Sequence, residues 1–458
     1  MYVEAPFTPK TDEERFLVIQ KIHGFIPKLK TSWVEKCWKS LKLQKMTGGC
    51  FYSSVFLFND IENLIYNFIL MSDLYYYLNW MDYAQEAINQ HKKYQWKLTT
   101  LSKVPLETKD DLATYYTPWV AAPCLEIAQD KNLAYDYTWK NNSVAVVSDG
   151  SAVLWLGNIG PEAWLPVMEW KAILFKKYGN IDAIPIVLNT QDPDEIIKVV
   201  EAIAPTFGGI NLEDIAAPNC FYIEEELKKR LNIPVFHDDQ HWTAIVVLAW
   251  LINALKLKNA DFSTQKIVIS GAWAAAIAIG KLLKKAWAEN IIFLDSKWVI
   301  YEWRDNLNKY KEEIAPWNIE QISWTLDDAI KWADIFIWVS KPGLLHKEHI
   351  QSMNVDPIIF ALANPTPEIM PDEAREAGAF IVATWRSDFP NQVNNVLAFP
   401  GIFRGALDAR IPQITDQHKI AAAKALANFV ENPDREHIIP SAFDEWIADR
   451  VAEAVKSV

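Results

Sequence analysis

The sequence predicts an α/β fold whose strands form doubly wound parallel sheets. Three observations support this prediction. Short runs of apolar and β-branched residues recur from residue 143 onward, and turn residues bound each run. Longer amphipathic stretches lie between these runs, as helices do between parallel strands. Some of these stretches begin at an Asp, a residue type that caps helix N-termini.

The expected elements follow one another from residue 81. The expected strands are "SVAVVSD" (143–149), "AIPIVLN" (183–189), "IPVFHD" (233–238), "KIVISG" (266–271), "NIIFLDS" (290–296), "ADIFIWVS" (333–340), "PIIFALAN" (357–364) and "AFIVATW" (379–385). The expected helices include "MDYAQEAINQHKKYQ" (81–95), "DPDEIIKVVEAIA" (192–204), "TAIVVLAWLINALKL" (243–257), "AIAIGKLLKKA" (276–286) and "DDAIKWA" (327–333). Residues 1–80 are aromatic and Asn-rich without a clear period, so no fold is predicted for them. We therefore expect an N-terminal extension over 1–80 and two domains, over 81–242 and 243–458.

Composition excludes several classes of protein. The chain has 458 residues and a formal net charge of −13, so it lacks the basic excess that binding to nucleic acid requires. Its most apolar stretch, residues 51–80, is interrupted by Asn and acidic residues and does not predict a membrane span. Its four cysteines match neither a disulfide framework nor a CxxC zinc pattern. We expect a cytoplasmic protein with no nucleic acid or membrane partner.

A Rossmann-like βαβ unit is predicted over residues 266–295. "KIVIS" supplies the strand and Gly271-Ala272-Trp273-Ala274-Ala275-Ala276 the turn, and the next helix would point its N-terminus at a dinucleotide pyrophosphate. Asp295 ends the following strand, where an acidic residue binds a ribose hydroxyl. The pattern GxGxxG/A is satisfied at Gly271 and Ala276 but fails at Trp273. From these letters alone, an Ala-rich helix start in any α/β protein is an equal alternative.

Two acidic pairs follow apolar runs and predict a cation site. Glu213 and Asp214 end one run, and Asp238 and Asp239 end another. Carboxylates at the C-terminal ends of neighbouring parallel strands converge on one crevice, where hard cations such as Mg²⁺ or Mn²⁺ take oxygen ligands. Solvated turn acids or helix caps are the alternative interpretation. The histidines near the second pair lack the cysteines or the HExxH frame of a zinc site.

Tryptophan is abundant in this chain and glycine is scarce. There are 21 Trp and 15 Gly, whereas glycine alone makes up about 7% of ordinary proteins. One of the tryptophans, Trp273, stands where a nucleotide-binding turn needs its smallest residue. The excess of tryptophan is similar in size to the shortage of glycine.

From about residue 81 to the C-terminus, the chain resembles a bacterial malic enzyme, the divalent-metal and NAD(P)-dependent oxidative decarboxylase of malate. The resemblance is carried by "YYTPWVAAPCLEIAQD", "SDGSAVLWLGNIGPEAWLPVMEWKA", "NTQDPDE", "APTFGGINLEDIAAP", "IPVFHDDQHWTAIV", "ALANPTPEIMP" and "WRSDFPNQVNNVLAFPGIFRGALD". It implies that 81–242 is the N-terminal substrate and metal domain. It also implies that 243–458 is a Rossmann NAD(P)-binding domain with C-terminal helices.

The resemblance also implies roles for individual residues. They are Tyr116 as general acid, Lys171 as general base with Asp238 as its partner, Glu213, Asp214 and Asp239 as metal ligands, Asn364 and Asn395 as amides that hold substrate and nicotinamide, and Asp295 at the adenosine ribose. The resemblance implies NAD or NADP and Mg²⁺ or Mn²⁺ as cofactors. It implies malate and pyruvate as the small molecules that are bound, and a homo-oligomer as the assembly. Asp295 favours NAD, while Lys297 could neutralise the extra phosphate of NADP.

Family motifs carry glycine at many of the tryptophan positions. These are Trp119, Trp155, Trp164, Trp170, Trp242, Trp250, Trp273, Trp298 and Trp385, and we expect the same of Trp96, Trp287, Trp332 and Trp338. Genuine indoles there would strain turns that need a positive φ and would crowd the cofactor turn, the metal and Lys171. UGA codons that the organism reads as glycine would explain the pattern, and residues 1–80 would then be either translated spacer or a genuine arm for oligomer contacts.

Two other interpretations treat the tryptophans as genuine. The chain could be a catalytically inactive malic enzyme relative that acts as a binding or scaffold protein, because Trp273 and other indoles block the cofactor cleft. The indoles could instead stack on sugars or single-stranded nucleic acid, but no basic residues are interleaved with them.

Overall fold

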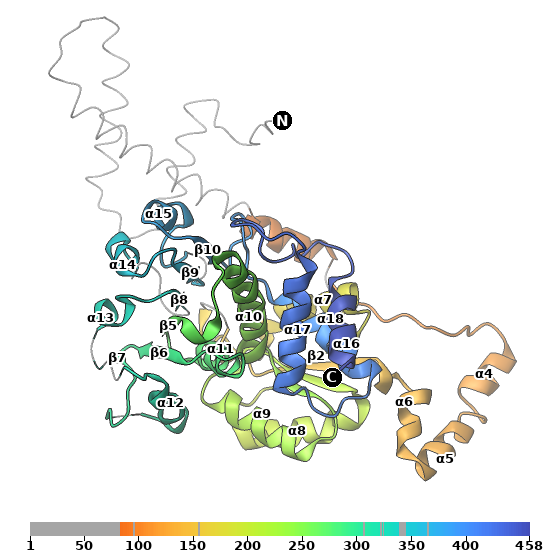
Figure 1. Ribbon diagram of the computed structural model, residues 1–458. Helices are drawn as coiled ribbons and strands as arrows, with labels where there is room; N and C mark the ends of the chain where they lie inside the picture. The colour runs from red at the N-terminus through yellow and green to blue at the C-terminus, as the bar shows by residue number, and fades with distance from the viewer. Residues whose placement is uncertain are drawn as a thin grey trace, which may run out of the picture. The chain divides into compact units, whose positions relative to one another are not determined.

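The computed structural model describes residues 83–94, 97–153, 156–305, 307–320, 323, 325–338, 345–363 and 366–458 (Figure 1). The chain divides into two compact units, Met1–Tyr94 and Gln95–Val458. In the first unit, residues 83–94 form the helix that the sequence predicts, while the extension over 1–80 lies outside the described residues. Everything described below belongs to the second unit.

The first sheet has four parallel strands in the order β2-β1-β3-β4. The strands are β1 (Ser143–Ser148), β2 (Asp182–Val187), β3 (Gly209–Leu212) and β4 (Val235–His237). The connecting helices are α7 (Pro161–Gly179), α8 (Pro193–Ile203) and α9 (Asn219–Arg230). Strand β1 is buried along its whole length, which is why its sequence is apolar without alternation. Asp192 caps α8 by accepting a hydrogen bond from the Glu195 backbone N–H, as the sequence predicts.

The second sheet has six strands in the order β10-β9-β8-β5-β6-β7, all parallel except β7. The strands are β5 (Lys266–Ser270), β6 (Asn290–Asp295), β7 (Trp298–Val299), β8 (Ile335–Trp338), β9 (Ile358–Ala361) and β10 (Ile381–Thr384). The helices are α10 (Asp238–Lys258), α11 (Ala274–Lys285), α12 (Lys309–Ile314), α13 (Leu326–Ile330), α14 (Lys347–Ser352) and α15 (Pro371–Glu376). The strand order reverses at β5, which places a ligand crevice at its carboxyl end. This is the Rossmann-like, doubly wound sheet that the sequence predicts.

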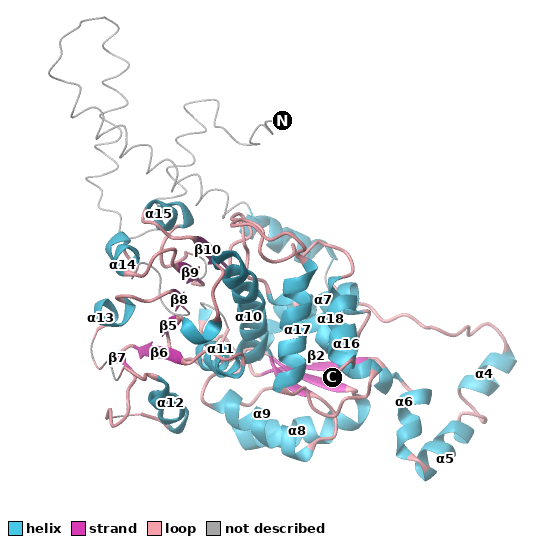
Figure 2. Ribbon diagram, viewed as in Figure 1, coloured by secondary structure: helices cyan, strands magenta, loops and turns pink. Residues whose placement is uncertain are grey.

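Three C-terminal helices complete this unit: α16 (Phe399–Asp408), α17 (Asp416–Phe429) and α18 (Ile447–Lys456). Figure 2 shows them as cyan ribbons beside the long helix α10. Helices α16 and α18 approach closely at Gly401, where a Cβ atom would lie 2.6 Å from the Ala448 carbonyl oxygen. No helix in the described part of the chain is long and apolar enough to cross a membrane.

The remaining helices, α4 (Lys109–Tyr115), α5 (Ala121–Gln129) and α6 (Ala134–Tyr137), lie to one side of the rest of this unit (Figure 1). None of them contains a buried residue. We call residues 99–137, which contain these helices, the arm.

Three details of the predicted elements were wrong. The long helix α10 begins at Asp238, not at Thr243, so the second acidic pair opens a helix and does not end a strand. Helix α13 is capped by Thr325 in a capping box with Asp328, although the sequence argument placed the cap at Asp327. Strand β7 was missed because two residues are too few to show a period.

Several tryptophans occupy backbone conformations that suit glycine. Five have a positive φ: Trp287 (72°), Trp298 (90°), Trp303 (70°), Trp332 (61°) and Trp446 (70°). A bulky residue in this region is strained, by about 1–3 kcal/mol each. Four others are buried with an indole N–H that has no partner among the described residues, namely Trp164, Trp242, Trp250 and Trp338. Trp303 and Trp446 were not among the tryptophans that the sequence analysis placed at family glycine positions.

Trp332→Gly is expected to stabilise the folded chain by about 1 kcal/mol, because it relieves the positive φ of an exposed residue. The matched control is Trp317→Gly. Trp317 lacks a positive φ and packs 6.1 Å from the Phe293 ring, so its loss is expected to destabilise by about 2–4 kcal/mol. Urea denaturation measures both changes, and equal destabilisation by both variants would contradict the prediction.

Candidate active site

A buried lysine lies between two carboxylates where the first sheet meets α10. Lys171 comes from α7, and its Nζ lies 2.9 Å from Glu213 Oε1, just beyond β3, and 2.8 Å from Asp238 Oδ1 at the start of α10. All three side chains are buried. Burial lowers the pKa of Lys171, but the charges of Asp238 and Glu213 outweigh it and hold this pKa above its ordinary value. The lysine is therefore an ammonium in this arrangement.

Amide side chains complete the surroundings of this lysine. Asn395 donates from Nδ2 to Asp238 Oδ2 at 3.5 Å and accepts from the Thr243 hydroxyl at 3.4 Å. Asn211 donates from Nδ2 to Glu213 Oε2 at 2.8 Å. Sequence reasoning missed Asn211, although its position two residues before Glu213 in an extended segment puts both side chains on one face. The structure thus brings Lys171, Glu213, Asp238 and Asn395 together.

The carboxylates predicted to bind a metal repel one another. Burial and the neighbouring charge of Asp238 raise the pKa of Glu213 to about 8. Burial and the charges of Asp239 and Glu213 hold the pKa of Asp214 well above its usual range, and burial also raises that of Asp239. One lysine cannot neutralise four acids, so this donor set suits a divalent cation of the Mg²⁺ or Mn²⁺ class.

The same carboxylates are not arranged as a complete coordination sphere for a metal ion. Across the described residues, no three His, Cys, Asp or Glu side chains are grouped so that they could hold a metal ion. Lys171 binds Glu213 in this arrangement, and Asn211 Oδ1 and both ring nitrogens of His237 are buried with no partner in the described part of the chain. Polar atoms without partners next to repelling carboxylates fit a site that is completed by an ion and its water ligands.

One residue predicted for the site does not lie there in this structure. Tyr116 lies on the arm, directly after α4, and its side chain is 67% exposed. It contacts none of the site residues named above. Asn364 lies outside the described residues. Trp170, which the sequence argument expected to crowd Lys171, is 52% exposed.

The second sheet carries a cavity of about 910 Å³ at the end of β5. Its wall includes Gly271, Ala272, Trp273 and Asp295, the turn and the strand-end acid of the predicted βαβ unit. Gly271 has a φ of 118°, which favours glycine, and the buried Ala276 lets α11 pack closely on the sheet. The Trp273 side chain is 63% exposed at the N-cap of α11, where a pyrophosphate would bind.

Asp295 is held by two cations that sequence reasoning missed. Arg304 donates from Nη1 and Nη2 to its two oxygens at 3.0 and 2.5 Å, and Lys311 Nζ lies 2.7 Å from Oδ2. Although burial opposes it, the hydrogen bonds from Arg304 and Lys311 lower the pKa of Asp295 to about 2. Lys297, which we considered as a partner for an NADP phosphate, contacts Asp295 through its backbone N–H.

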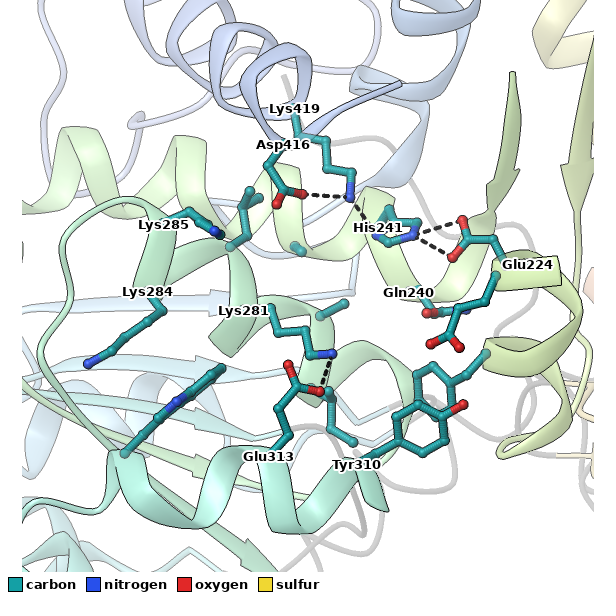
Figure 3. A pocket seen from close by; sticks show the side chains of 17 residues that line it. Glu224, Gln240, His241, Lys281, Lys284, Lys285, Tyr310, Glu313, Asp416 and Lys419 are labelled. Carbon is teal, nitrogen blue, oxygen red and sulfur yellow. Dashed lines mark hydrogen bonds and ion pairs between the residues drawn. The ribbon is translucent and has the colours of Figure 1, made fainter. Parts of the chain in front are cut away.

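A second cavity of about 490 Å³ lies among α9, α10, α11, α12 and α17 (Figure 3). A chain of polar contacts crosses it. Glu224 binds His241 Nε2 at 2.9 Å, Lys419 Nζ lies 3.3 Å from His241 Nδ1, and Asp416 binds Lys419 at 3.0 Å. The acids are paired with cations, so this cavity has no charge excess that would select a ligand. Its chain of contacts joins α9 and α10 to α17.

The stability of the fold is expected to fall between pH 6.5 and about pH 3 through His241. Burial lowers the pKa of His241 to about 3, so the folded chain holds a neutral ring that the unfolded chain protonates below its ordinary pKa of 6.5. Protons bound only by the unfolded state lower stability as the pH falls. His241→Gln should reduce this slope relative to the parent chain in urea titrations at several pH values. Identical slopes in the two proteins would contradict the prediction.

Comparison with known proteins gives consistent results over both sheets. The family profile "Malic enzyme, N-terminal domain" matches residues 95–228, and "Malic enzyme, NAD binding domain" matches residues 241–457. The chain is 57% identical over 379 residues to the bifunctional malic/malolactic enzyme of Bacillus subtilis, which covers 82% of this chain and 92% of that protein. It is 52% identical over 362 residues to the NAD-dependent malic enzyme of Geobacillus stearothermophilus, which covers 78% of this chain and 76% of that one.

Solved structures agree. The malic enzyme of Pyrococcus horikoshii superposes with a TM-score of 0.77 at 50% identity, over 79% of this chain and 86% of that chain. The NAD-dependent malic enzyme of Thermotoga maritima gives a TM-score of 0.79 at 48% identity, over 81% and 98%. The NAD-binding family profile over the Rossmann-like sheet, with relatives named NAD- or NADP-dependent malic enzymes, identifies an NAD(P)-dependent oxidoreductase. Since the two family profiles match most of the chain, the chain belongs to the malic enzyme family.

Proposed function

We propose that this protein catalyses the oxidative decarboxylation of (S)-malate to pyruvate and CO₂, with reduction of NAD⁺ or NADP⁺ and with a divalent cation bound. The observation that carries the proposal is the contact of Lys171 with Glu213 and Asp238 beside Asn395. Alcohol oxidation needs a base for the C2 hydroxyl proton while hydride leaves C2 for nicotinamide. A buried lysine can take that proton when burial or a nearby cation lowers its pKa.

Each step of this reaction is assigned to a residue of the chain. Lys171 takes the C2 hydroxyl proton, and Asp238 orients its ammonium and balances its charge. Asn395 positions the substrate through its amide. Tyr116 returns a proton to C3 of the enol that remains after CO₂ leaves. When bound by Glu213, Asp214 and Asp239, a divalent cation would supply Lewis-acid stabilisation and a field that lowers the pKa of Lys171.

We also propose that the native enzyme has glycine at the positions where family motifs have it and this chain has tryptophan, because UGA is read as glycine. The five tryptophans with positive φ and the four buried unpaired indoles support this proposal. The tryptic peptide Ile267–Lys281 from the native organism is expected to have the mass that glycine gives at position 273. A tryptophan mass there would favour the alternative of an inactive relative that acts as a scaffold.

Activity is tested with a chain that has glycine at the family positions. It is expected to reduce NAD⁺ or NADP⁺ when malate and Mn²⁺ are both present, and to lose this activity when EDTA removes the metal. Absorbance of the reduced nicotinamide and release of pyruvate are the measurements. Reduction without malate, or at an unchanged rate in EDTA, would contradict the proposal.

A further inference from the structure

Every acceptor position of the Asp295 carboxylate is occupied. Its Oδ1 accepts hydrogen bonds from the Lys297 backbone N–H at 2.8 Å and from Arg304 Nη1 at 3.0 Å. Its Oδ2 accepts from Arg304 Nη2 at 2.5 Å and from Lys311 Nζ at 2.7 Å. A carboxylate oxygen has two lone pairs, so each oxygen already accepts the two hydrogen bonds that it can. Asp295 therefore has no acceptor position left for the ribose 2′-hydroxyl of NAD, the group that an acid at this strand end binds.

Asp295 and its two cationic partners form a buried cluster with a positive net charge. The exposed fraction of the side chain is 8% for Asp295, 10% for Arg304 and 21% for Lys311. Arg304 also donates from Nη1 to the Trp298 and Val299 carbonyl oxygens, which fixes the cluster to β7. With a pKa of about 2, Asp295 is an anion at neutral pH. One negative and two positive charges leave the cluster with a net charge of +1.

Lys311 is the cation of this cluster that lies at the cofactor cavity. It lines the cavity of about 910 Å³ together with Asp295 and Ser296. Arg304 and the exposed Lys297 do not line it. An ammonium has three N–H donors, and Asp295 accepts one of those on Lys311. Lys311 and the Ser296 hydroxyl therefore offer donors at the end of β6, where a Rossmann-like fold binds the adenosine ribose.

A 2′-phosphate suits this cluster better than a 2′-hydroxyl does. The hydroxyl of NAD needs an acceptor at the strand end, and the cluster presents donors there. The phosphate of NADP is an anionic acceptor, and hydrogen bonds between an ammonium and a phosphate are stronger than those between neutral groups. A carboxylate by itself would repel the phosphate, but the two cations bound to Asp295 reverse the sign of the local charge.

We propose that this chain selects NADP over NAD, and that Lys311 determines the choice by binding the 2′-phosphate while Arg304 neutralises Asp295. The inference rests on the proposed function, in which a nicotinamide dinucleotide is the oxidant, and it names which of the two dinucleotides serves. It also assigns the phosphate to Lys311 and not to Lys297, the residue that the sequence suggests.

Calorimetric titration with NADPH and NADH tests this assignment in the absence of malate. The glycine-containing chain is expected to bind NADPH at least about 10-fold more tightly than NADH. Lys311→Met keeps a long side chain but removes the charge, and it is expected to weaken NADPH binding by about 10–100-fold. It also vacates one acceptor position on Asp295, so NADH binding should stay unchanged or tighten. That retained NADH binding shows that the variant is folded.

The matched control is Lys297→Met, which removes a lysine close to Asp295 whose side chain does not line the cavity. It should leave both dissociation constants unchanged. NADH that binds the parent chain as tightly as NADPH does would overturn the proposal. So would a Lys311→Met variant in which NADPH binding is unchanged, or is weakened no more than NADH binding. A loss of NADPH binding in Lys297→Met alone would place the phosphate at Lys297 and would also refute it.

The proposed function has a separate outcome. If NADPH is preferred in binding but malate is not oxidised, the proposed function fails and the assignment of Lys311 stands. If malate is oxidised with the same kcat/KM for NAD⁺ and NADP⁺, the proposed function stands and the preference for NADP is refuted.

Discussion

Trp273→Gly is expected to tighten the binding of NADH or NADPH by about 100-fold or more, which corresponds to roughly 2.7 kcal/mol. Position 273 is the N-cap of α11, and the backbone N–H groups that follow it would bind the pyrophosphate. An indole at this cap occupies the space that the phosphates need, and its side chain stands in the wall of the cofactor cavity. Its φ of −95° is one that any residue adopts, so the expected gain comes from space and not from relief of strain.

Calorimetric titration of the reduced dinucleotide measures this effect. Trp332→Gly serves as the control. This substitution also removes an indole, but Trp332 does not line the cofactor cavity. It should stabilise the fold and leave the dissociation constant unchanged. If Trp273→Gly and Trp332→Gly bind the dinucleotide equally weakly, the indole at position 273 is not what limits cofactor binding.

Local sequence patterns were sufficient for most of the sheet. The eight expected strands all appear, as β1, β2, β4, β5, β6, β8, β9 and β10, because strands inside a covered parallel sheet are apolar along most of their length. The turn from Gly271 to Ala276 and the acid at Asp295 also lie where the βαβ order requires, around one cavity. These features depend on residues that are close in the sequence.

The parts that sequence could not supply depend on distant contacts. No sequence pattern around Asp295 indicates that Arg304 and Lys311 bind it. The path of the chain after Asp295 returns both side chains to its carboxylate. The position of Tyr116 is similar, since the motif around it indicates a catalytic role but not that an arm carries it away from Lys171. The pKa of Lys171 also differs from the lowered value that a base needs, because two carboxylates face it in this arrangement.

Lys171→Arg is expected to lower kcat for malate oxidation by about 10²–10⁴-fold while the stability of the fold changes little. A guanidinium can still bind Glu213 and Asp238, but its pKa, above about 12, does not allow it to act as a base. Lys171→Ala should lose the same activity and also lose stability, because Glu213 and Asp238 would then be buried without their cation.

The comparison of these two variants separates catalysis from structure. Both are made in the glycine-containing chain, and kcat, the KM for malate and the urea midpoint are measured for each. If Lys171 is the general base, the two substitutions reduce kcat alike but differ in urea midpoint. If Lys171 only balances buried charge, Lys171→Arg keeps most of the activity, and the base must be sought among the other groups at the site.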